Sequence, residues 1–327
     1  MPADRGLALA ARGRWRAWEI AFWALAFAAI PLAQKHHLIL NEIVITALFA
    51  VSLDLILGYA GIASLGHTAF FGFGAYAAGI FAIRVTGEPF AGLAFATAAA
   101  AALGFVTSFL VLRGVDLARL MVTLGVALVL GEIANQTGWL TGGADGLQGV
   151  TIAPILGRFE FDIFGTTAFA YSLAVTFVLF VFARRLVVSP FGLSLTAIRD
   201  NPLRARAVGI PLNRRLVAVY TLAAAYAGAA GALLAQTTQF VSPDVLALHR
   251  SADVLLMLVI GGTGWLYGGV VGALAFKILQ DVISAWTPQY WTFWVGLILV
   301  ILVLAGRERI ARRLRSGLAA LLPGRRP

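Results

Sequence analysis

The chain has 327 residues, of which 60% are hydrophobic and only 12% are charged, and its mean hydropathy is +0.89. A soluble domain of this length would need a far more polar surface, and a membrane barrel would show short alternating strands instead of long apolar runs. Cysteine is absent, which excludes disulfides, thiolate nucleophiles and cysteine metal ligands. We therefore expect an all-α polytopic integral membrane protein.

The positions of the basic residues predict how the chain is oriented. The net charge is +10, and most of the 25 lysines and arginines lie in the N-terminal arm 1–17, the polar segment 184–215 and the C-terminal tail 307–327. The positive-inside rule places all three in the cytoplasm. The high isoelectric point then reflects topology and does not call for nucleic acid, although anionic lipid or an acidic partner could also contact these segments. One membrane domain, 18–306, separates the two basic ends.

Apolar segments long enough to be membrane spans follow one another along the chain. They lie near 18–33, 38–57, 61–83, 90–112, 119–137, 166–183, 215–236, 252–283 and 290–306. The first of them follows a basic arm, as a signal peptide does, but its aromatic residues and the later spans favour a retained anchor. The number of segments is odd, whereas two cytoplasmic termini require an even number of crossings.

The segment 252–283 is the first place to look for the missing crossing. As one helix it would be about 48 Å long, against a hydrocarbon core of about 30 Å. The sequence GGTGWLYGG interrupts it, so we expect two short spans near 250–263 and 266–283 and about ten helices in all, within a range of eight to ten. A re-entrant hairpin at 61–83 would also correct the parity. The glycines of the expected break are Gly261, Gly262 and Gly264.

The chain carries no recognisable catalytic or nucleotide-binding motif. Its only lysines are Lys35 and Lys277, and neither belongs to a GxxxxGK[ST] loop. The four histidines have no metal-ligand spacing. We therefore expect no enzyme activity, no metal and no cofactor in this chain. Transport would be driven either by an ion gradient, which usually requires carboxylates within the membrane, or by a separate cytoplasmic ATPase.

The polar segment 184–215 distinguishes between these two energy sources. It reads RRLVVSPFGLSLTAIRDNPLRARAVGIPLNRR and is too polar to enter lipid. Between its prolines, one helical face can carry Leu203, Ala207 and Ile210 while the arginines point to the other side. Such a helix either lies on the membrane surface or docks into a groove of a partner.

Five separate motifs occur in an order that is typical of one transporter family. They are GYAGIASLGHTAFFGFGAYAA, then MVTLGVAL with GWLTGGADGL, then SPFGLSLTAIRDNPLRARAVGI, then AYAGAAGALLAQTTQFVSP, and finally LLMLVIGGTGWLYGGVVGA. Together they resemble the LivM-like permease subunits of bacterial branched-chain amino-acid ABC importers. The resemblance runs from about residue 40 to 300.

The resemblance implies that the chain is one half of a permease heterodimer in the bacterial inner membrane. Its partners would be a LivH-like permease, two cytoplasmic ATPase subunits similar to LivG and LivF, and a periplasmic substrate-binding protein. ATP and Mg would be bound by the ATPases. Membrane lipid would surround the chain, and no nucleic acid would be involved.

The segment 189–211 resembles the coupling loop through which such permeases contact their ATPases. Asp200 or Asn201 can cap a helix there, and Gly209 can end it. Family members commonly have an acidic residue after the Asp-Asn pair, whereas this chain has Pro202 followed by arginines, which could alter or reverse a charged contact. The usual Pro-Gly ending after the last span is also replaced, by AGRERIARRLRSG. The ATPase-contacting positions implied by the resemblance are Arg199, Asp200, Asn201, Ala205, Ala207 and Gly209.

The translocation path is less clearly marked. Ser64 and His67 lie in the small-residue stretch, where they can line a cavity or simply bond a neighbouring helix. Glu132 and Asn135 lie near the outer end of a span, where they can line the path or form a solvated cluster. We take these four residues as the path candidates.

The substrate is open at this point. Walls of Ala, Gly and Phe suit branched-chain amino acids but also many other small solutes, so an importer of urea, short amides or aromatic acids with the same architecture remains an alternative. An ion-coupled secondary transporter is the second alternative. This alternative predicts uptake that collapses with the ion gradient and needs no ATPase. A pure membrane scaffold is a further alternative, but it would not explain the glycine-broken spans.

Overall fold

The computed structural model describes residues 15–298, except 115, 163, 291–292 and 295. These residues form helices and connecting turns, with two isolated β-bridges and no strand among them. The helices are α2 (Ala17–Leu32), η1 (Gln34–His36), α3 (His37–Leu57), α4 (Thr68–Arg84), α5 (Pro89–Val111), α6 (Asp116–Gln136), α7 (Gly138–Thr141), η2 (Gly143–Asp145), α8 (Thr166–Val188), α9 (Pro190–Asp200), α10 (Pro202–Ala207), α11 (Leu212–Thr238), η3 (Pro243–Leu246), α12 (Leu248–Gly261) and α13 (Leu266–Trp286).

Six of the described helices are long and apolar enough to cross a membrane, namely α3, α5, α6, α8, α11 and α13. Two shorter apolar helices, α2 and α4, accompany them. Because these helices coincide within a few residues with sequence-predicted spans, the chain is a multi-pass helical membrane protein. The total of about ten helices stays a prediction. The predicted span near 290–306 lies largely outside the described residues, and the tail 307–327 lies wholly outside them.

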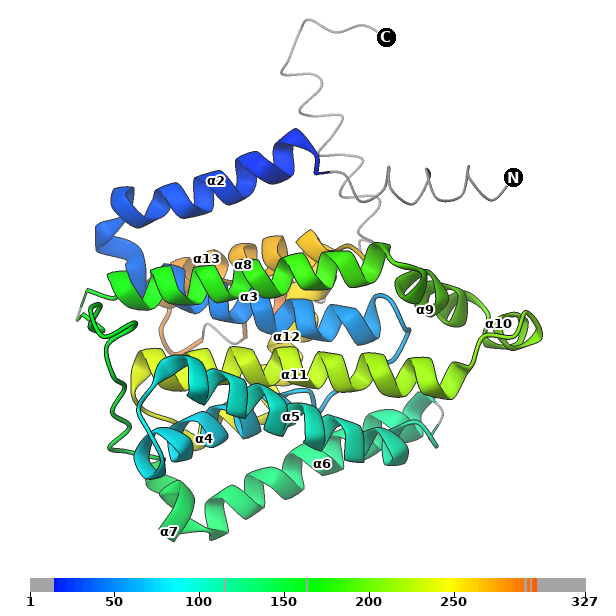
Figure 1. Ribbon diagram of the computed structural model, residues 1–327, viewed down its shortest axis with the longest axis horizontal. Helices are drawn as coiled ribbons and strands as arrows, with labels where there is room; N and C mark the ends of the chain where they lie inside the picture. Colours follow the sequence, from blue (N-terminus) through cyan, green and yellow to red (C-terminus); the bar gives the residue numbers. More distant parts are fainter. Residues whose placement is uncertain (1–14, 115, 163, 291–292, 295, 299–327) are drawn as a thin grey trace, which may run out of the picture. The chain divides into compact units, whose positions relative to one another are not determined.

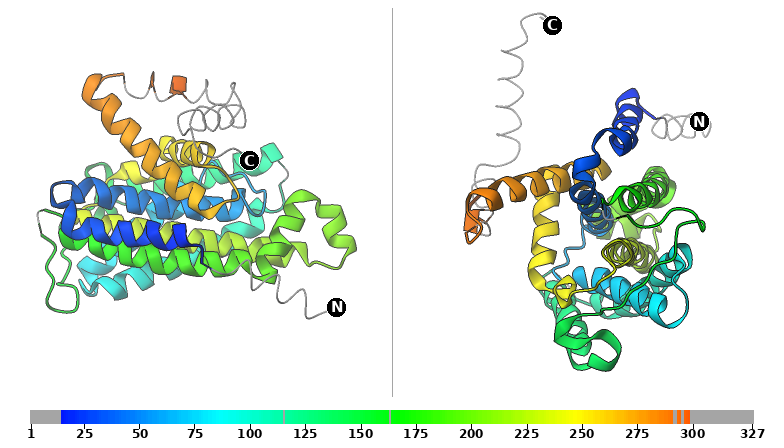
Figure 2. Two further views of the ribbon diagram at one scale, coloured as in Figure 1. Left: turned by 90° about the horizontal axis from the view of Figure 1, so that it is seen from above. Right: turned by 90° about the vertical axis from the view of Figure 1, so that its left-hand side faces the viewer.

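The chain divides into two compact units, Met1–Ala273 and Leu274–Pro327. In the first unit, α11 runs along α3, α4 and α5 (Figures 1 and 2). Small residues allow this close packing: a Cβ atom at Gly228 would collide with Ala100 of α5, and one at Gly231 would collide with the backbone of Phe71 in α4. Because lipid is as apolar as these helices, such backbone proximity is what holds membrane helices together.

The span predicted at 61–83 is helical only from Thr68 onward, so the prediction of a membrane helix is wrong for residues 61–67. Gly61 has a φ of +71°, which a right-handed helix cannot contain. A Cβ atom at Gly66 would overlap the carbonyl of Thr123 in α6. This glycine-rich segment is therefore a turn pressed against α6. From Thr68 to Arg84 the chain forms one helix. The re-entrant arrangement of 61–83 stays a prediction.

The long segment predicted to break at GGTGWLYGG is indeed two helices, because α12 ends at Gly261 and α13 begins at Leu266. Between them, Gly262 has a φ of +104° and Gly264 a φ of +77°. These values lie in a region that residues with a Cβ atom rarely adopt. The first turns of α13 then pack on α12, since a Cβ atom at Gly261 would overlap the carbonyl of Gly268.

The two ends of the long helices in the first unit differ in character. In Figure 1, α9 and α10 lie at one end, while α7 lies at the other.

At the α7 end, Asp162 begins α8 by accepting hydrogen bonds from the backbone N–H groups of Thr166, at 3.1 Å, and Thr167, at 2.9 Å. Burial acts to raise the pKa of Asp162, but these bonds outweigh it and hold the pKa below its ordinary value.

Candidate functional site

The candidate coupling site is the pair of short helices α9 and α10, and both begin in the same way. The Ser189 hydroxyl accepts a hydrogen bond from the N–H of Phe191 at 3.2 Å, and the side-chain Oδ1 atom of Asn201 accepts one from the N–H of Arg204 at 2.9 Å. A proline follows each cap, at the first helical position, where no N–H is needed. Pro202, the departure from the family pattern, is therefore a helix-starting residue.

The end of α10 is a complete Schellman motif. The N–H of Gly209 donates to the carbonyl of Arg206 at 2.9 Å, and the N–H of Ile210 donates to the carbonyl of Ala205 at 3.1 Å. Gly209 has a φ of +88°. No other heavy atom lies within 4 Å of the position that a Cβ atom would take there. The requirement for glycine at this position is thus one of backbone conformation and not of space.

A small apolar cluster seats the loop on the start of α11. Its buried members are Ile198 of α9, Ala205 of α10 and Leu212 of α11, and Ile210 and Leu216 pack against them. The predicted helical face with Leu203, Ala207 and Ile210 is not formed as one face, because α10 ends at Ala207 and Ile210 lies beyond it. Leu203 and Ala207 are exposed, as a face that contacts lipid or a partner would be, and Ala205 is the buried residue of α10. Past the Schellman turn, Ile210 reaches back to the cluster.

The outer surface of the loop combines apolar and basic side chains. Leu203 is 79% exposed and Val208 is 77% exposed, although both are aliphatic. Arg204 and Arg206 are exposed on the same short helix. Two exposed aliphatic side chains on a projecting loop are typical of an interaction surface. We call Leu203, Arg204, Arg206 and Val208 the loop surface.

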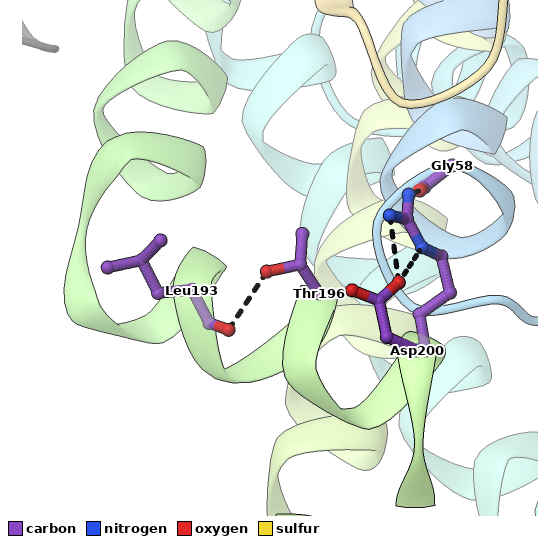
Figure 3. A network of polar contacts seen from close by, with 5 residues as sticks. Gly58, Leu193, Thr196 and Asp200 are labelled. Atoms are coloured by element: carbon purple, nitrogen blue, oxygen red, sulfur yellow. Dashed lines mark hydrogen bonds and ion pairs between the residues drawn. The ribbon is translucent and has the colours of Figure 1, made fainter.

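The side chain of Arg199, at the last turn of α9, contacts the end of α3 as well as its neighbour Asp200. Its Nε and Nη2 atoms each donate to Oδ1 of Asp200 at 3.1 Å, and its Nη1 atom donates to the carbonyl of Gly58 (Figure 3). Gly58 is the residue that ends α3. Of the six predicted contact positions, Arg199 therefore links the loop to a membrane helix, while Asp200, Asn201, Ala207 and Gly209 are exposed.

Asp54 of α3 reaches the glycine break between α12 and α13. Its Oδ1 atom accepts a hydrogen bond from the N–H of Gly264 at 2.7 Å, and its side chain is fully buried. The sequence analysis did not select Asp54. The signal that could have found it is a carboxylate inside an apolar span, four residues before the Gly58 turn, since a buried charge in a membrane is costly unless it is paired or hydrogen-bonded.

Ser64 and His67, the first two path candidates, are buried in the segment between α3 and α4. The His67 ring stacks on Phe49, with ring centroids 5.6 Å apart, and its Nε2 atom lies 2.9 Å from the Ser52 hydroxyl. Since that hydroxyl donates to the carbonyl of Phe49, Nε2 of His67 carries the proton and donates to Ser52. His67 is thus packed and bonded to α3, which fits the structural role better than a path-lining role, whereas Oγ of Ser64 and Nδ1 of His67 are buried without a hydrogen-bond partner.

Glu132 and Asn135, the other path candidates, are exposed on the last turns of α6. Gln136 donates from Nε2 to Oε1 of Glu132 at 2.7 Å, since residues four positions apart lie on the same face of a helix. The four path candidates thus fall into a buried pair and an exposed pair that the structure does not join. Their assignment to the path stays a prediction. Among the described residues, no group of three or more His, Asp or Glu side chains could hold a metal ion.

The fold and the loop define the class: a multi-pass helical membrane protein that presents a rigid two-helix loop at one end of its helices. A family model described as "Branched-chain amino acid transport system / permease component" matches residues 37–304. The chain belongs to this family, as the sequence motifs indicated.

Individual relatives show the same similarity. The chain is 26% identical over 285 residues to the high-affinity branched-chain amino acid transport system permease protein LivM of Escherichia coli K12, covering 79% of this chain and 65% of the relative. LivM of Salmonella typhimurium is 27% identical over 306 residues, covering 83% and 70%. The autoinducer 2 import system permease protein LsrC of Enterobacter sp. 638 is 29% identical over 228 residues, covering 66% and 63%. The chain thus spans about two thirds of the length of these relatives. No solved structure matches significantly.

Proposed function

We propose that the chain is the transmembrane permease subunit of an ATP-driven ABC importer, most simply one for branched-chain amino acids. The observation that carries this proposal is the loop of α9 and α10, which is capped at both helix starts, closed by a Schellman turn and seated on α11. A rigid loop with an exposed apolar pair is suited to transmit force from a docked partner. The family match and the two LivM relatives support the same conclusion.

The partners belong to the proposal as well. A second, LivH-like permease would complete the translocation path, two cytoplasmic ATPases would bind ATP and Mg, and a periplasmic protein would deliver the substrate. The chain would lie in the bacterial inner membrane with both termini in the cytoplasm. The basic segments support this orientation, because α9 and α10 carry arginines at one end of the helices.

The loop surface favours an ATPase groove with acidic rims. Arg204 and Arg206 lie between Leu203 and Val208 in the sequence, and all four side chains are exposed, so a complementary partner would offer apolar contacts together with carboxylates. Because Pro202 occupies the first position of α10 where an acidic residue is common, the charge of this contact is shifted toward positive. We therefore expect the ATPase of the same importer to be more acidic at this contact than the ATPases of related importers.

The mechanism follows from this arrangement. When ATP binding closes the two ATPases, α9 and α10 move with them as one body, since the cluster of Ile198, Ala205 and Leu212 joins them to α11. The helix α11 in turn packs along α3, α4 and α5. Movement of the loop therefore tilts the helices of this subunit against those of its partner and alternates access between the two sides of the membrane.

Two other functions remain distinguishable by experiment. One relative bears the name of an autoinducer 2 import permease, so related permeases carry chemically different substrates, and urea, short amides or aromatic acids would use the same coupling. An ion-coupled transporter is the second candidate. It predicts that uptake collapses with the ion gradient and continues without ATP, whereas the proposed importer requires ATP hydrolysis.

The decisive test is purification of the tagged chain from its native membrane in mild detergent, with mass spectrometry and an ATPase assay on the same sample. We expect two P-loop ATPases, a second permease and vanadate-sensitive hydrolysis that rises when substrate-loaded binding protein is added. Recovery of the chain alone, without ATPase activity and with gradient-driven uptake in vesicles, would overturn the proposal and favour the ion-coupled transporter.

A further inference from the structure

Two features that are far apart in the sequence meet at the end of α3. One is the candidate coupling loop, in which Arg199 of α9 bonds to Gly58. The other is the glycine break between α12 and α13, in which Gly264 bonds to Asp54. Between them lie Asp54 and Gly58, one turn apart on the last turns of α3.

The contacts at this point leave no spare room. Arg199 donates to the carbonyl of Gly58, and Gly264 donates to Asp54. A Cβ atom at Gly58 would collide both with Oδ1 of Asp54 and with the backbone nitrogen of Gly264. A Cβ atom at Gly264 would lie 3.2 Å from Nη1 of Arg199 and 3.2 Å from the carbonyl oxygen of Gly58. The guanidinium, the end of α3 and the break are therefore in direct contact.

The aliphatic part of Arg199 is also fixed by the turn that follows α3. A Cβ atom at Gly61 would lie only 2.9 Å from Cγ of Arg199, so the side chain rests on the glycine turn while its guanidinium bonds to Gly58. Asp54, which is fully buried, has one carboxylate oxygen without a hydrogen-bond partner.

We propose that Arg199 is a positioning residue that carries movement of the coupling loop to the glycine break between α12 and α13, through Gly58 and Asp54. This inference rests on the proposed function and deepens it. Hydrogen bonds weaken steeply when they lengthen or bend, so a shift of α9 either carries the end of α3 with it or breaks the bond to Gly58. The break is suited to respond, because Gly262 and Gly264 have backbone conformations open to glycine and can absorb changes in φ and ψ.

Stability alone does not explain this arrangement. The ion pair between Arg199 and Asp200 is solvent-exposed on both side chains, and such pairs contribute little. The bond that needs a cause is the one from Arg199 to a backbone carbonyl 141 positions away, beside a hinge-like break held by a buried carboxylate. A link between the loop and the break accounts for both.

The test compares Arg199→Gln with Arg199→Lys in the complete importer, reconstituted in proteoliposomes. The matched control is Arg113→Gln, which removes an exposed arginine from the turn between α5 and α6. Membrane abundance, ATPase recovery, basal hydrolysis and substrate taken up per ATP hydrolysed are measured for each. We expect Arg199→Gln to lose about tenfold in substrate taken up per ATP hydrolysed, compared with wild type at equal ATPase content of the complex. Arg199→Lys, which retains one charged donor, should lose less, and Arg113→Gln should match the wild type.

A second readout reports on the break itself. The chain has no cysteine, so Thr263→Cys introduces a single thiol between Gly262 and Gly264. Its labelling rate with a small thiol reagent is compared between the ATP-free and the vanadate-trapped importer. We expect the labelling rate to change several-fold between the two states in the importer that retains Arg199 and to stay the same in the one that carries Arg199→Gln. A merely structural role for Arg199 would not remove this state dependence from a protein that still hydrolyses ATP.

The outcomes separate this inference from the proposed function. If the wild type contains no ATPase, the proposed function fails and the link fails with it. If the ATPases are present and Arg199→Gln has wild-type uptake per ATP and state-dependent labelling, the link alone is overturned. If Arg199→Gln does not reach the membrane, Arg199→Met replaces it, because methionine keeps an aliphatic side chain but has no donor for the Gly58 carbonyl. Uptake per ATP and labelling both equal to wild type would then overturn the link, and a loss of both would support it.

Discussion

Replacing Gly209 with valine should impair the coupling loop without touching any neighbouring side chain. The φ of +88° at Gly209 lies in the left-handed region, which costs a residue with a Cβ atom about 1–2 kcal/mol. Apart from its own chain neighbours, no heavy atom lies within 4 Å of the Cβ position, so the cost comes from the local backbone conformation and not from packing against other parts of the protein. A penalty of this size shifts the equilibrium between the closed and the unwound Schellman turn by about 5- to 30-fold.

The Schellman turn at Gly209 sets how α10 returns to α11, so we expect strain at this residue to displace the loop from its seat. We expect Gly209→Val to lower uptake by about 5- to 30-fold while its abundance in the membrane stays near that of the wild type. Uptake of radiolabelled substrate into proteoliposomes, with quantitative blotting, measures both. The matched control is Gly209→Asn, because asparagine tolerates the left-handed conformation. Equal activity of Gly209→Val and wild type, or equal damage from valine and asparagine, would refute the reasoning.

Three further predictions concern other parts of the first unit. Gly58→Ala should abolish accumulation of folded protein, because the added methyl collides with Asp54 and the break; normal yield on gel filtration would contradict the packing. His67→Ala should lower the free energy of unfolding by about 2–4 kcal/mol without changing substrate preference, since it leaves a cavity beside Phe49 and removes the hydrogen bond to Ser52; a changed preference in competition assays would support a path role instead. Because the pKa of Asp162 is depressed, its contribution to stability is present above its ordinary value of 3.8 and is lost as the pH falls below that value. Asp162→Asn should therefore lower the melting temperature at pH 7 and weaken its decrease below pH 4, and an unchanged acid profile would count against the cap.

The sequence by itself determined the class, the spans and the local features of the loop. Apolar length and composition mark membrane helices because the bilayer selects for them directly, and the predicted span 38–57 corresponds to α3 almost residue for residue. The caps at Asn201 and the turn at Gly209 were also accessible, since capping depends on side chains a few residues apart. The break at GGTGWLYGG could be predicted for the same reason: glycines interrupt a helix that is too long for the membrane.

The tertiary structure alone decided which of these parts touch. Ala205 and not Leu203 or Ala207 enters the cluster, because the short α10 is placed by its contact with α11 and not by its own periodicity. The bond from Arg199 to Gly58 joins residues 141 positions apart, and the bond from Gly264 to Asp54 joins residues 210 positions apart. No local pattern contains such pairs, because they arise only when helix packing brings a donor and an acceptor to the same place.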